Sequence, residues 1–377
     1  MTTAPTADLS RLRERRWPPP ASMSADHAVT QALYSGTWTS GRYTHTAEAT
    51  LRELTGAPHA VAFQSCTAAI HAALLAHHVR ADTPLHTPAF GFAGTLTGAA
   101  HIGARLMYHD VDPNTGNSVD PLAGPGAVIL TPDLHGVPHT VPRDPDVTVI
   151  TDSCQSLGTL VDRQHVGATG THCWSFSATK LVSAPDGGAV TTDDEHLADD
   201  LRQLRDYGAT PGGVRANALI TRPGHNWRPS ELSMAIVADE LTNRLPFAAA
   251  RARDVGTRVR QTLAELGLWH QDVPAGTEPA FHKIRTGLPG HPATTVDRFT
   301  AALADAGIPY HPWGRIPLHE HPVFAPRRPD SLRAPVATSL ARTTVCLGTE
   351  ACPPWTWTDE ETELLCHTLE SIMETVL

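Results

Sequence analysis

Lysine is nearly absent from this chain of 377 residues, which carries 27 arginines but only two lysines, Lys180 and Lys283. Because lysine is so scarce, an ordinary surface position is a poor explanation for either one. No long basic run occurs and the formal net charge is −10, so we expect neither a nucleic acid nor an anionic membrane surface as a partner. No run of eighteen apolar residues could span a bilayer, and the arginine-rich start has no apolar segment behind it, so we expect no signal peptide.

Motifs for disulfides, metals and nicotinamide cofactors are also missing. The six cysteines form no CxxC pair, which predicts small buried side chains in a reducing cytoplasm. No HExxH occurs, and His319, Glu320 and His321 are better explained as a solvated polar rim than as ligands, so we expect no metal. No GxGxxG follows the first predicted strand, which argues against a nicotinamide-dependent dehydrogenase.

Short apolar runs alternate with helical patterns from residue 48 onward. Strands are predicted at 59–63, 84–87, 105–110, 126–131, 147–151, 172–176 and 188–192. This alternation predicts an α/β fold with a mostly parallel seven-stranded sheet and helices on both faces. The last hundred residues change to a strand–helix–strand–helix order, which predicts a smaller C-terminal α+β domain.

The chain length allows two or three domains, at about 150 residues per domain. We divide it into an extended N-terminal arm (1–30), in which three consecutive prolines oppose a helix, a large domain (31–245) and a small domain (246–377). Two crossovers, after Asp120 and over 137–147, are rich in glycine or proline and short, whereas a parallel crossover normally needs about a dozen residues or more. We therefore expect them to lack helices, with the arm covering the sheet face beside them.

Three segments carry groups that could do chemistry. The helix start SCTAA (65–69) offers backbone N–H groups and two hydroxyls to an anion, although its serine or threonine could merely cap the helix. Asp152 ends a strand where parallel sheets bind ligands, although it could equally be a helix cap. Lys180 follows small residues beside an apolar strand, and desolvation there would lower its pKa as a Schiff-base lysine requires; a snorkelling surface lysine is the alternative.

Together these segments predict a site for pyridoxal 5'-phosphate (PLP). Lys180 would hold the aldehyde of the cofactor as an imine. Asp152 would keep the pyridine nitrogen protonated, so that the ring can accept electrons. The helix start at 65–69 and Ser175 would hold the phosphate.

With further motifs in the same order, the sequence resembles the DegT/StrS-like sugar aminotransferases, PLP enzymes with the aspartate-aminotransferase fold. The resemblance runs from about Ser35 to the C-terminus. One such motif would be weak, but seven in this order are strong. They are SCTAA (65–69), PAFGFAGT (88–95), DVDPNTGN (110–117), TDSCQSLG (151–158), SFSATK (175–180), DGGAVTT (186–192) and GHNWRPSEL (224–232).

The resemblance implies a role for each matching residue around the cofactor ring. Lys180 is the Schiff-base lysine and the base that moves a proton between substrate and cofactor. Asp152 pairs with the pyridine nitrogen, and Gln155 approaches the ring hydroxyl. Phe92 stacks on the ring.

For the phosphate, the resemblance implies that Thr67, Ala68 and Ser175 bind it within one subunit. Asn226 reaches it from the neighbouring subunit. The active unit is therefore expected to be a homodimer with shared active sites.

The sequence also departs from the family pattern near the expected site. Cys66 replaces a glycine, Asp186 a glutamate, and Asp133 a histidine, and residues 153, 154 and 157 differ around Asp152. These changes leave the cofactor machinery intact but put the usual nucleotide-sugar substrate in doubt. The C-terminal part resembles the branch that forms inosamines and aminohydroxybenzoate, which would place Trp313, Arg315 and His319 near the mouth of the site.

The resulting interpretation is a cytoplasmic aminotransferase. It would move an amino group from glutamate or glutamine to a small cyclic ketone, such as a ketosugar or cyclitol, in secondary-metabolite or antibiotic biosynthesis. One alternative is another PLP reaction, such as dehydration, cyclisation or condensation. A non-catalytic regulatory homologue is the third hypothesis, and the joint presence of Lys180, Asp152 and Gln155 argues against it.

Overall fold

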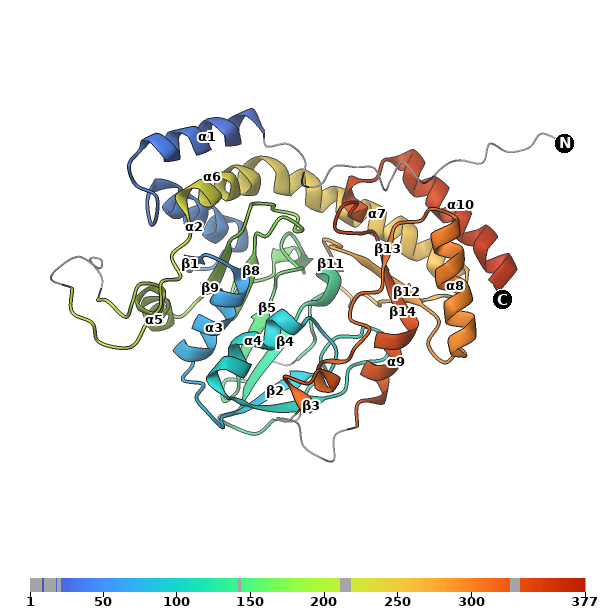
Figure 1. The fold of residues 1–377 in the computed structure, drawn as a ribbon, viewed down its shortest axis with the longest axis horizontal. Coiled ribbons are helices and arrows are strands. Elements are labelled where there is room, and N and C mark those ends of the chain that lie inside the picture. Colours follow the sequence, from blue (N-terminus) through green and yellow to red (C-terminus); the bar gives the residue numbers. More distant parts are fainter. Residues whose placement is uncertain are drawn as a thin grey trace.

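The computed structural model describes residues 9, 18, 22–121, 123–141, 144–210, 218–325 and 333–376, and its largest element is a seven-stranded sheet (Figure 1). All seven predicted strands are confirmed, to within two residues at each end. Their order across the sheet is β1 (His59–Phe63), β9 (Gly188–Thr192), β8 (Thr171–Ser175), β5 (Thr148–Asp152), β4 (Val128–Pro132), β2 (Pro84–Pro88) and β3 (Arg105–His109).

Strand β9 runs antiparallel to both of its neighbours, whereas the other pairs along the sheet from β8 to β3 are parallel. Its first residue, Gly188, therefore lies opposite Phe63 at the end of β1 and opposite Ser175 at the end of β8. Asp152, the last residue of β5, lies opposite Cys173 of β8. The carboxyl ends of β1, β5 and β8 thus meet at one edge of the sheet, where parallel sheets bind ligands.

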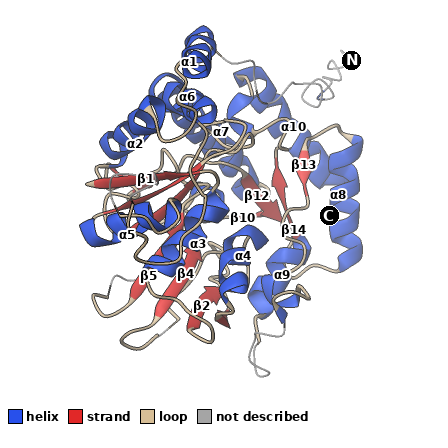
Figure 2. Ribbon diagram, turned by 60° about the vertical axis from the view of Figure 1, so that its left-hand side comes forward, coloured by secondary structure: helices blue, strands red, loops and turns tan. Residues whose placement is uncertain are grey.

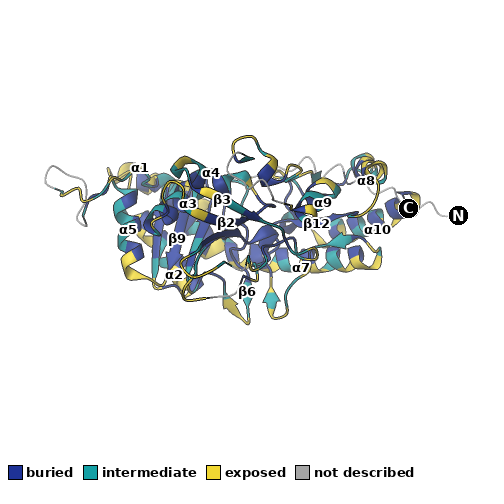
Figure 3. Ribbon diagram, turned by 90° about the horizontal axis from the view of Figure 1, so that it is seen from below, coloured by how far each residue is buried: buried dark blue, intermediate teal, exposed yellow. Residues whose placement is uncertain are grey.

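Helices cover both faces of this sheet, as predicted (Figure 2). On one face lie α3 (Cys66–Ala76), α4 (Ala93–Ile102) and α5 (Glu195–Arg205). On the other lie α2 (Arg42–Thr55) and α6 (Glu231–Asp239). Helix α5 shows how the sequence sets the packing: Leu197, Leu201 and Leu204 recur at helical spacing and are all buried. Figure 3 shows the resulting layers, with buried strands between helices whose outer surfaces are exposed.

Helix α1 (Met23–Tyr34) corrects the prediction of an extended arm over residues 1–30. The side chain of Ser22 caps this helix by accepting a hydrogen bond from the backbone N–H of Ala25 (2.9 Å), so the helix begins just after the prolines that oppose one. Helix α1 packs on α6. Apart from Leu9 and Pro18, residues 1–21 lie outside the described part of the chain.

A long helical segment connects two hydrophobic cores. Helix α6 continues through a π-helical turn (Glu240–Arg244) into α7 (Leu245–Glu265). The first half of α7 packs beneath the large sheet through Ala248 and Ala252, and its second half enters a separate core through Val255 and Val259. One rigid element therefore fixes the two cores relative to each other.

The second core belongs to a four-stranded antiparallel sheet in the C-terminal part, where the smaller α+β unit was predicted. Leu9 of the N-terminal arm is buried in this core. The strands in order are β10 (Trp269–His270), β12 (Ile284–Gly287), β14 (Thr344–Leu347) and β13 (Tyr310–His311). Helices α8 (Ala293–Asp305) and α10 (Asp359–Val376) pack in this core, whereas α9 (Pro335–Thr343) contributes its buried residues to a core of the large sheet. A small third sheet is formed by β11 (Thr277–Glu278), β6 (Leu160–Val161) and β7 (Gln164–His165).

The two short crossovers contain no α-helix in the residues that the structure describes, as expected. A single 3-10 turn, Leu134–Gly136, comes just before the second crossover. Beside it, a hollow of about 910 Å³ lies over the sheet and is lined by Val149 and Thr151 of β5 and His172 of β8. The arm was expected to cover this face. Its Leu9 packs with the second core, and, apart from Pro18, the other arm residues before Ser22 lie outside the described part of the chain. No helix in the described residues is long and apolar enough to cross a membrane.

The contact between α7 and the strand region before β12 yields a stability prediction. A Cβ atom at Gly256 would lie 2.0 Å from the ring of the buried Phe281. Alanine favours a helix by about 1 kcal/mol over glycine, whereas overpacking costs about 1–3 kcal/mol. Because the new Cβ atom would lie so close to the ring, we expect the cost of overpacking to exceed the gain in helix propensity. Gly256→Ala should lower the free energy of unfolding in urea by about 1–2 kcal/mol. The exposed neighbour control, Thr257→Ala, should change it by less than about 0.5 kcal/mol; a more stable Gly256→Ala protein would contradict the packing.

Candidate active site

A cavity of about 260 Å³ lies where the ends of β5 and β8 meet the start of α3. Eight residues were expected to bind a cofactor, and the structure brings six of them together around this cavity: Thr67, Phe92, Asp152, Gln155, Ser175 and Lys180. The other two are not among the described lining residues. Ala68 lies one position further into α3, and its backbone N–H donates to the Ser65 hydroxyl (3.2 Å). Asn226 is exposed and forms an isolated bridge with Asp206.

Asp152 is a buried carboxylate at the end of β5, with 3% of its surface exposed. Its Oδ2 accepts a hydrogen bond from Thr95 Oγ1 of α4 (2.6 Å), and its Oδ1 accepts one from the backbone N–H of Cys154 (3.2 Å). No arginine, lysine or histidine of the described residues forms an ion pair with it. Buried carboxylates are normally paired with a cation. A protonated pyridine ring bound in the cavity would supply the cation that Asp152 lacks.

Gln155 is held in one orientation by the backbone. Its Oε1 accepts a hydrogen bond from the backbone N–H of His135 (2.6 Å). His135 itself has a positive φ of 61° in the turn after β4, which aims this N–H at the glutamine. The oxygen is thereby occupied, so the amide NH₂ is left as a donor for a ligand hydroxyl.

Lys180 lies at the end of a tight turn after β8. Its backbone N–H donates to the carbonyl of Ser177 (3.0 Å), and its own carbonyl accepts from the hydroxyl of Ser183 (2.7 Å). These bonds fix the backbone of Lys180, and its side chain enters the cavity. There Nζ lies 3.7 Å from the sulfur of Cys154. Lys180 and Asp152 therefore face the same space from neighbouring strands.

The thiol of Cys66, which lines the same cavity, does not supply a nucleophile. A hydrogen bond with Cys154, together with burial and the charge of Asp152, raises the pKa of the Cys66 thiol well above its usual value. Cys66 therefore stays neutral, and neutral thiols are poor nucleophiles. The cavity consequently offers the amine of Lys180 as its reactive group rather than a thiolate.

The start of α3 forms the anion-binding end of the cavity. Ser65 caps the helix, while Thr67, Ser175, Ser177 and Thr179 bring hydroxyl groups to the same wall. The first N–H groups of a helix have no partner within the helix and attract anions. The number and placement of these hydroxyl and N–H donors suit a phosphate group.

Glycine is required where β9 passes this helix start. A Cβ atom at Gly188 would lie 2.4 Å from the backbone carbon of Ser65 and 2.5 Å from the backbone nitrogen of Cys66. Any side chain there would push the helix start away from β8 and so away from Ser175, which lies opposite Gly188. The DGG segment therefore sets the width of the anion-binding end.

Two aromatic rings stand at the edge of the cavity. Phe92, the N-cap residue of α4, is 53% exposed, and its ring lies nearly parallel to that of Trp313 at 6.4 Å between centroids. Trp313 comes from the C-terminal part of the chain and lines the cavity as expected. An exposed phenyl face beside Asp152 and Lys180 is suited to stacking on a flat ligand.

Two other residues expected at the mouth lie elsewhere. Arg315 is exposed, and His319 is buried with its ring 6.0 Å from that of Tyr108; neither is among the described residues that line the cavity. The structure finds no group of metal ligands in the part of the chain that it describes, and this includes His319, Glu320 and His321.

Asp133, which departs from the family pattern, also has a structural role instead of a place at this cavity. Its carboxylate accepts hydrogen bonds from the hydroxyls of Ser153 (3.1 Å) and Ser156 (2.8 Å), and from the backbone N–H of His139 (3.1 Å). The replaced residues at 133 and 153 thus form one buried polar cluster. They hold the turns after β4 and β5 together.

Sequence reasoning missed the wall that comes from the four-stranded sheet. His282, Lys283 and Glu350 line the cavity together with Trp313. Burial, with the charges of Lys180 and Lys283, lowers the pKa of His282 well below its usual value, so this imidazole is neutral. The scarcity of lysine was the one available signal in the sequence. It singled out Lys283 but did not indicate where this residue lies in the fold.

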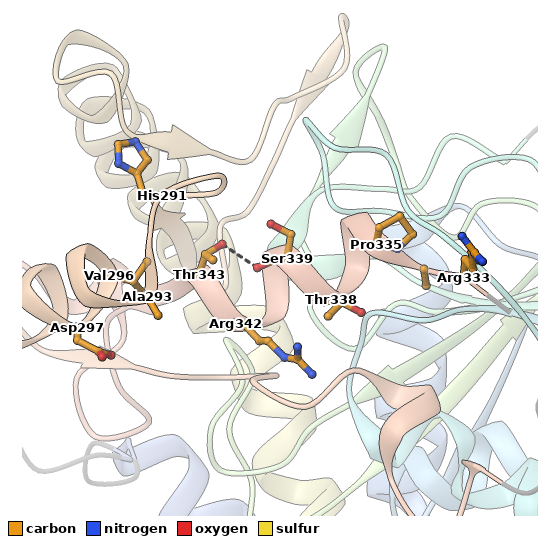
Figure 4. A pocket seen from close by; sticks show the side chains of 11 residues that line it. His291, Ala293, Val296, Asp297, Arg333, Pro335, Thr338, Ser339, Arg342 and Thr343 are labelled. Carbon is orange, nitrogen blue, oxygen red and sulfur yellow. Dashed lines mark hydrogen bonds between the residues drawn. The ribbon is translucent and has the colours of Figure 1, made fainter.

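A wider hollow of about 700 Å³ between α8 and α9 lacks comparable chemistry (Figure 4). Its charged side chains do not converge: Arg342 pairs with Glu320 (3.0 Å) and Asp297 lies on the opposite helix. The hydroxyl of Thr343 is used within α9, where it donates to the carbonyl of Ser339 (2.7 Å). The smaller cavity is therefore the candidate active site.

Comparisons with known proteins agree with this geometry. The profile of the DegT/DnrJ/EryC1/StrS aminotransferase family matches residues 22–352. Among solved structures, 3-amino-5-hydroxybenzoic acid synthase is 21% identical, with a TM-score of 0.84 and coverage of 95% of this chain and 98% of that one. A candidate sugar aminotransferase from Streptococcus pneumoniae in its PMP form is 21% identical, with a TM-score of 0.83 over 96% and 99% of the two chains. GDP-4-keto-6-deoxymannose-3-dehydratase with bound GDP-perosamine is 20% identical, with a TM-score of 0.83 over 94% and 99%.

Replacing the unpaired carboxylate of Asp152 should affect stability and turnover in opposite directions. Asp152→Asn removes a buried charge that has no described counter-ion, so the apoprotein should keep or raise its melting temperature. The same change removes the partner of a protonated ring nitrogen, so turnover of the cofactor-loaded protein should fall at least about a hundredfold. Thermal unfolding of the apoprotein and steady-state kinetics measure the two effects, with the exposed Asp305→Asn as control. A large loss of apoprotein stability would show that Asp152 is structural.

Proposed function

Because the chain belongs to the DegT/DnrJ/EryC1/StrS aminotransferase family, we propose that it is a PLP-dependent aminotransferase. Glutamate or glutamine gives the amino group, and a small cyclic ketone, such as a ketosugar, a cyclitol-derived ketone or a cyclic keto acid, receives it. The observation that carries this proposal is the buried Asp152, which has no cationic partner among the described residues and shares a cavity with Lys180. The C-terminal resemblance to the inosamine and aminohydroxybenzoate branch supports a role in secondary-metabolite biosynthesis, which we place in the cytoplasm.

PLP, when bound, supplies a ring that takes up the electron pair left when a proton leaves the amino-acid carbon. Lys180 would move this proton, because its side chain reaches the cavity beside Asp152. Asp152 holds the proton on the pyridine nitrogen, and the amide NH₂ of Gln155 donates to the ring hydroxyl. The exposed face of Phe92 orients the ring.

The phosphate end is held by neutral donors. Thr67 and Ser175 contribute hydroxyls, and the first turn of α3 contributes backbone N–H groups. Ser65 uses only the N–H of Ala68 for its cap, so the N–H groups of Cys66 and Thr67 stay available. The width of this end depends on Gly188, as the close approach of β9 shows.

A second candidate is a PLP-dependent reaction other than transamination, such as dehydration. The placement of the Cys154 sulfur 3.7 Å from the Lys180 amine favours it, because a thiol beside the base alters where a proton can be delivered. A dehydratase is also among the structural neighbours. Absorbance spectra after addition of the amino donor separate the two: an aminotransferase accumulates the amine form of the cofactor, whereas a lyase leaves the aldehyde form.

We further propose a homodimer with shared active sites. Large apolar side chains are exposed on α1 and on the segment that ends at Asn226, which supports burial of this surface by a second copy; they are Met23, Leu33, Tyr34, Leu219 and Ile220. Asn226 is exposed on the same segment and outside the cavity of its own chain. It would donate to the phosphate in the site of the partner.

The first functional prediction concerns the attachment of the cofactor. The purified protein should be yellow, and borohydride should bleach it and leave the cofactor covalently fixed on Lys180. Lys180→Ala should lose the covalent label and nearly all turnover. Peptide mapping after reduction is the measurement, and a label on Lys283 instead of Lys180 would overturn the assignment.

The second functional prediction concerns the shared site. Asn226→Ala removes one hydrogen bond to a charged group, worth about 1.5–3 kcal/mol, so PLP should bind about ten- to a hundredfold more weakly. In a mixed dimer of Asn226→Ala and Lys180→Ala subunits, one site carries both defects and the other carries neither. At a PLP concentration too low to load the Asn226→Ala protein, activity should return to about half of the wild-type value per dimer, because one of two independent sites is intact. If subunits exchange and the mixture stays inactive, Asn226 serves its own chain.

A further inference from the structure

The second lysine of the chain faces the same cavity as the first. Lys283 lies immediately before β12, is 7% exposed and lines the cavity from the side of the four-stranded sheet. Lys180 reaches the cavity from the large sheet. In a chain with only two lysines, both therefore border one small space.

The ammonium of Lys283 has no counter-ion in contact. Within the described residues it forms neither a hydrogen bond nor an ion pair. Burial lowers its pKa; Cys346 and Glu350 act against this effect, and Lys180 adds to it. A buried lysine is rare unless it is paired, so its position indicates a partner that is not part of the chain.

The surrounding charges make this wall of the cavity positive. His282 and His311 are neutral neighbours whose pKa values are lowered, chiefly by burial. Glu350 is the acidic group on this side, but it is exposed, so water screens its charge. The inner wall therefore favours an anion although the whole chain has a formal net charge of −10.

Arg285 adds positive charge behind this wall but is not free to bind a ligand. Its guanidinium donates to Thr344 Oγ1 (2.6 Å) and to the carbonyls of Trp313 (2.9 Å) and Leu340 (3.2 Å). It also lies over the ring of Phe90, at 4.6 Å from the centroid. All three nitrogens of the guanidinium are thus used, which leaves Lys283 as the cation that can reach a ligand.

We propose that Lys283 binds a carboxylate of the substrate, so that this enzyme acts on carboxylate-bearing molecules. The inference rests on the proposed function and specifies its substrate class. A phosphate is already provided for at the start of α3, whereas a single ammonium at the opposite wall suits one carboxylate. The carboxylate can belong to the amino donor or to a cyclic keto acid as acceptor. If it belongs to the acceptor, a fully neutral ketosugar would leave Lys283 unmatched.

A binding measurement tests the proposal without turnover. Glutarate, which has carboxylates but no amino group, is titrated calorimetrically into the protein as purified. Lys283→Met should weaken glutarate binding about ten- to a hundredfold, because one charged hydrogen-bonding partner is lost. Lys283→Arg should stay within about threefold of the wild type, since the charge is kept. Arg298→Met removes an exposed positive charge of α8 and is the control for net charge, expected to leave binding unchanged.

Two kinetic measurements show whether the carboxylate belongs to the amino donor or to the acceptor. If it is the amino donor, Lys283→Met raises KM for glutamate in the first half-reaction and leaves the ketone half-reaction unchanged. If it is the acceptor, the variant loses its preference for 3-oxocyclohexanecarboxylate over the corresponding neutral amide. Equal glutarate affinity of Lys283→Met and wild type, with no change in either kinetic measurement, would overturn the proposal.

Failure of this proposal is distinct from failure of the proposed function. Borohydride labelling of Lys180 in the Lys283→Met protein reports cofactor binding independently of the carboxylate. A labelled variant with unchanged glutarate affinity would reject the role of Lys283 alone. Should Lys283→Met fail to fold, Lys283→Gln provides the same loss of charge with a polar end group, and its glutarate affinity decides the question.

Discussion

The rest of the site depends on the close approach of β9 to the start of α3. Strand β9 passes so near the turn between β1 and α3 that a Cβ atom at Gly188 would lie 2.4 Å from the backbone of Ser65. This contact holds the first turn of α3 against the ends of β8 and β5. The anion-binding end, Lys180 and Asp152 then lie around one cavity because strands β1, β8 and β5 end at the same edge of the sheet. A glycine that contributes no side chain thus sets the distances among the reactive groups.

The second constraint is the rigid connection between two cores. Helix α7 packs beneath the large sheet with its first half and within the C-terminal core with its second half. Through this helix the four-stranded sheet is held against the large sheet, and residues 282, 283 and 313 close the cavity from the opposite side. The cavity is therefore a property of how the two units pack.

The two buried charges of the cavity have opposite signs and lie on different walls, which fits a zwitterionic ligand. One wall carries the buried carboxylate of Asp152, and the other carries the buried ammonium of Lys283. The imidazole of His282, on the same wall as Lys283, stays neutral, because burial and the charges of Lys180 and Lys283 lower its pKa. Each buried charge lacks a counter-ion among the described residues, so ligands are expected to complete both pairs.

The sequence alone determined the strand order along the chain, the mostly parallel sheet and the family, because strand and helix periodicities and the motifs around Lys180 and Asp152 are carried by neighbouring residues. It also indicated the helix-free crossovers from their length. It failed where the outcome depended on distant contacts: helix α1 forms within the supposed arm because it packs on α6, and Arg315 and His319 lie away from the cavity that they were expected to border. Only the tertiary structure placed Lys283 beside Lys180. The two are about a hundred positions apart, and no local pattern records that α7 brings their sheets together.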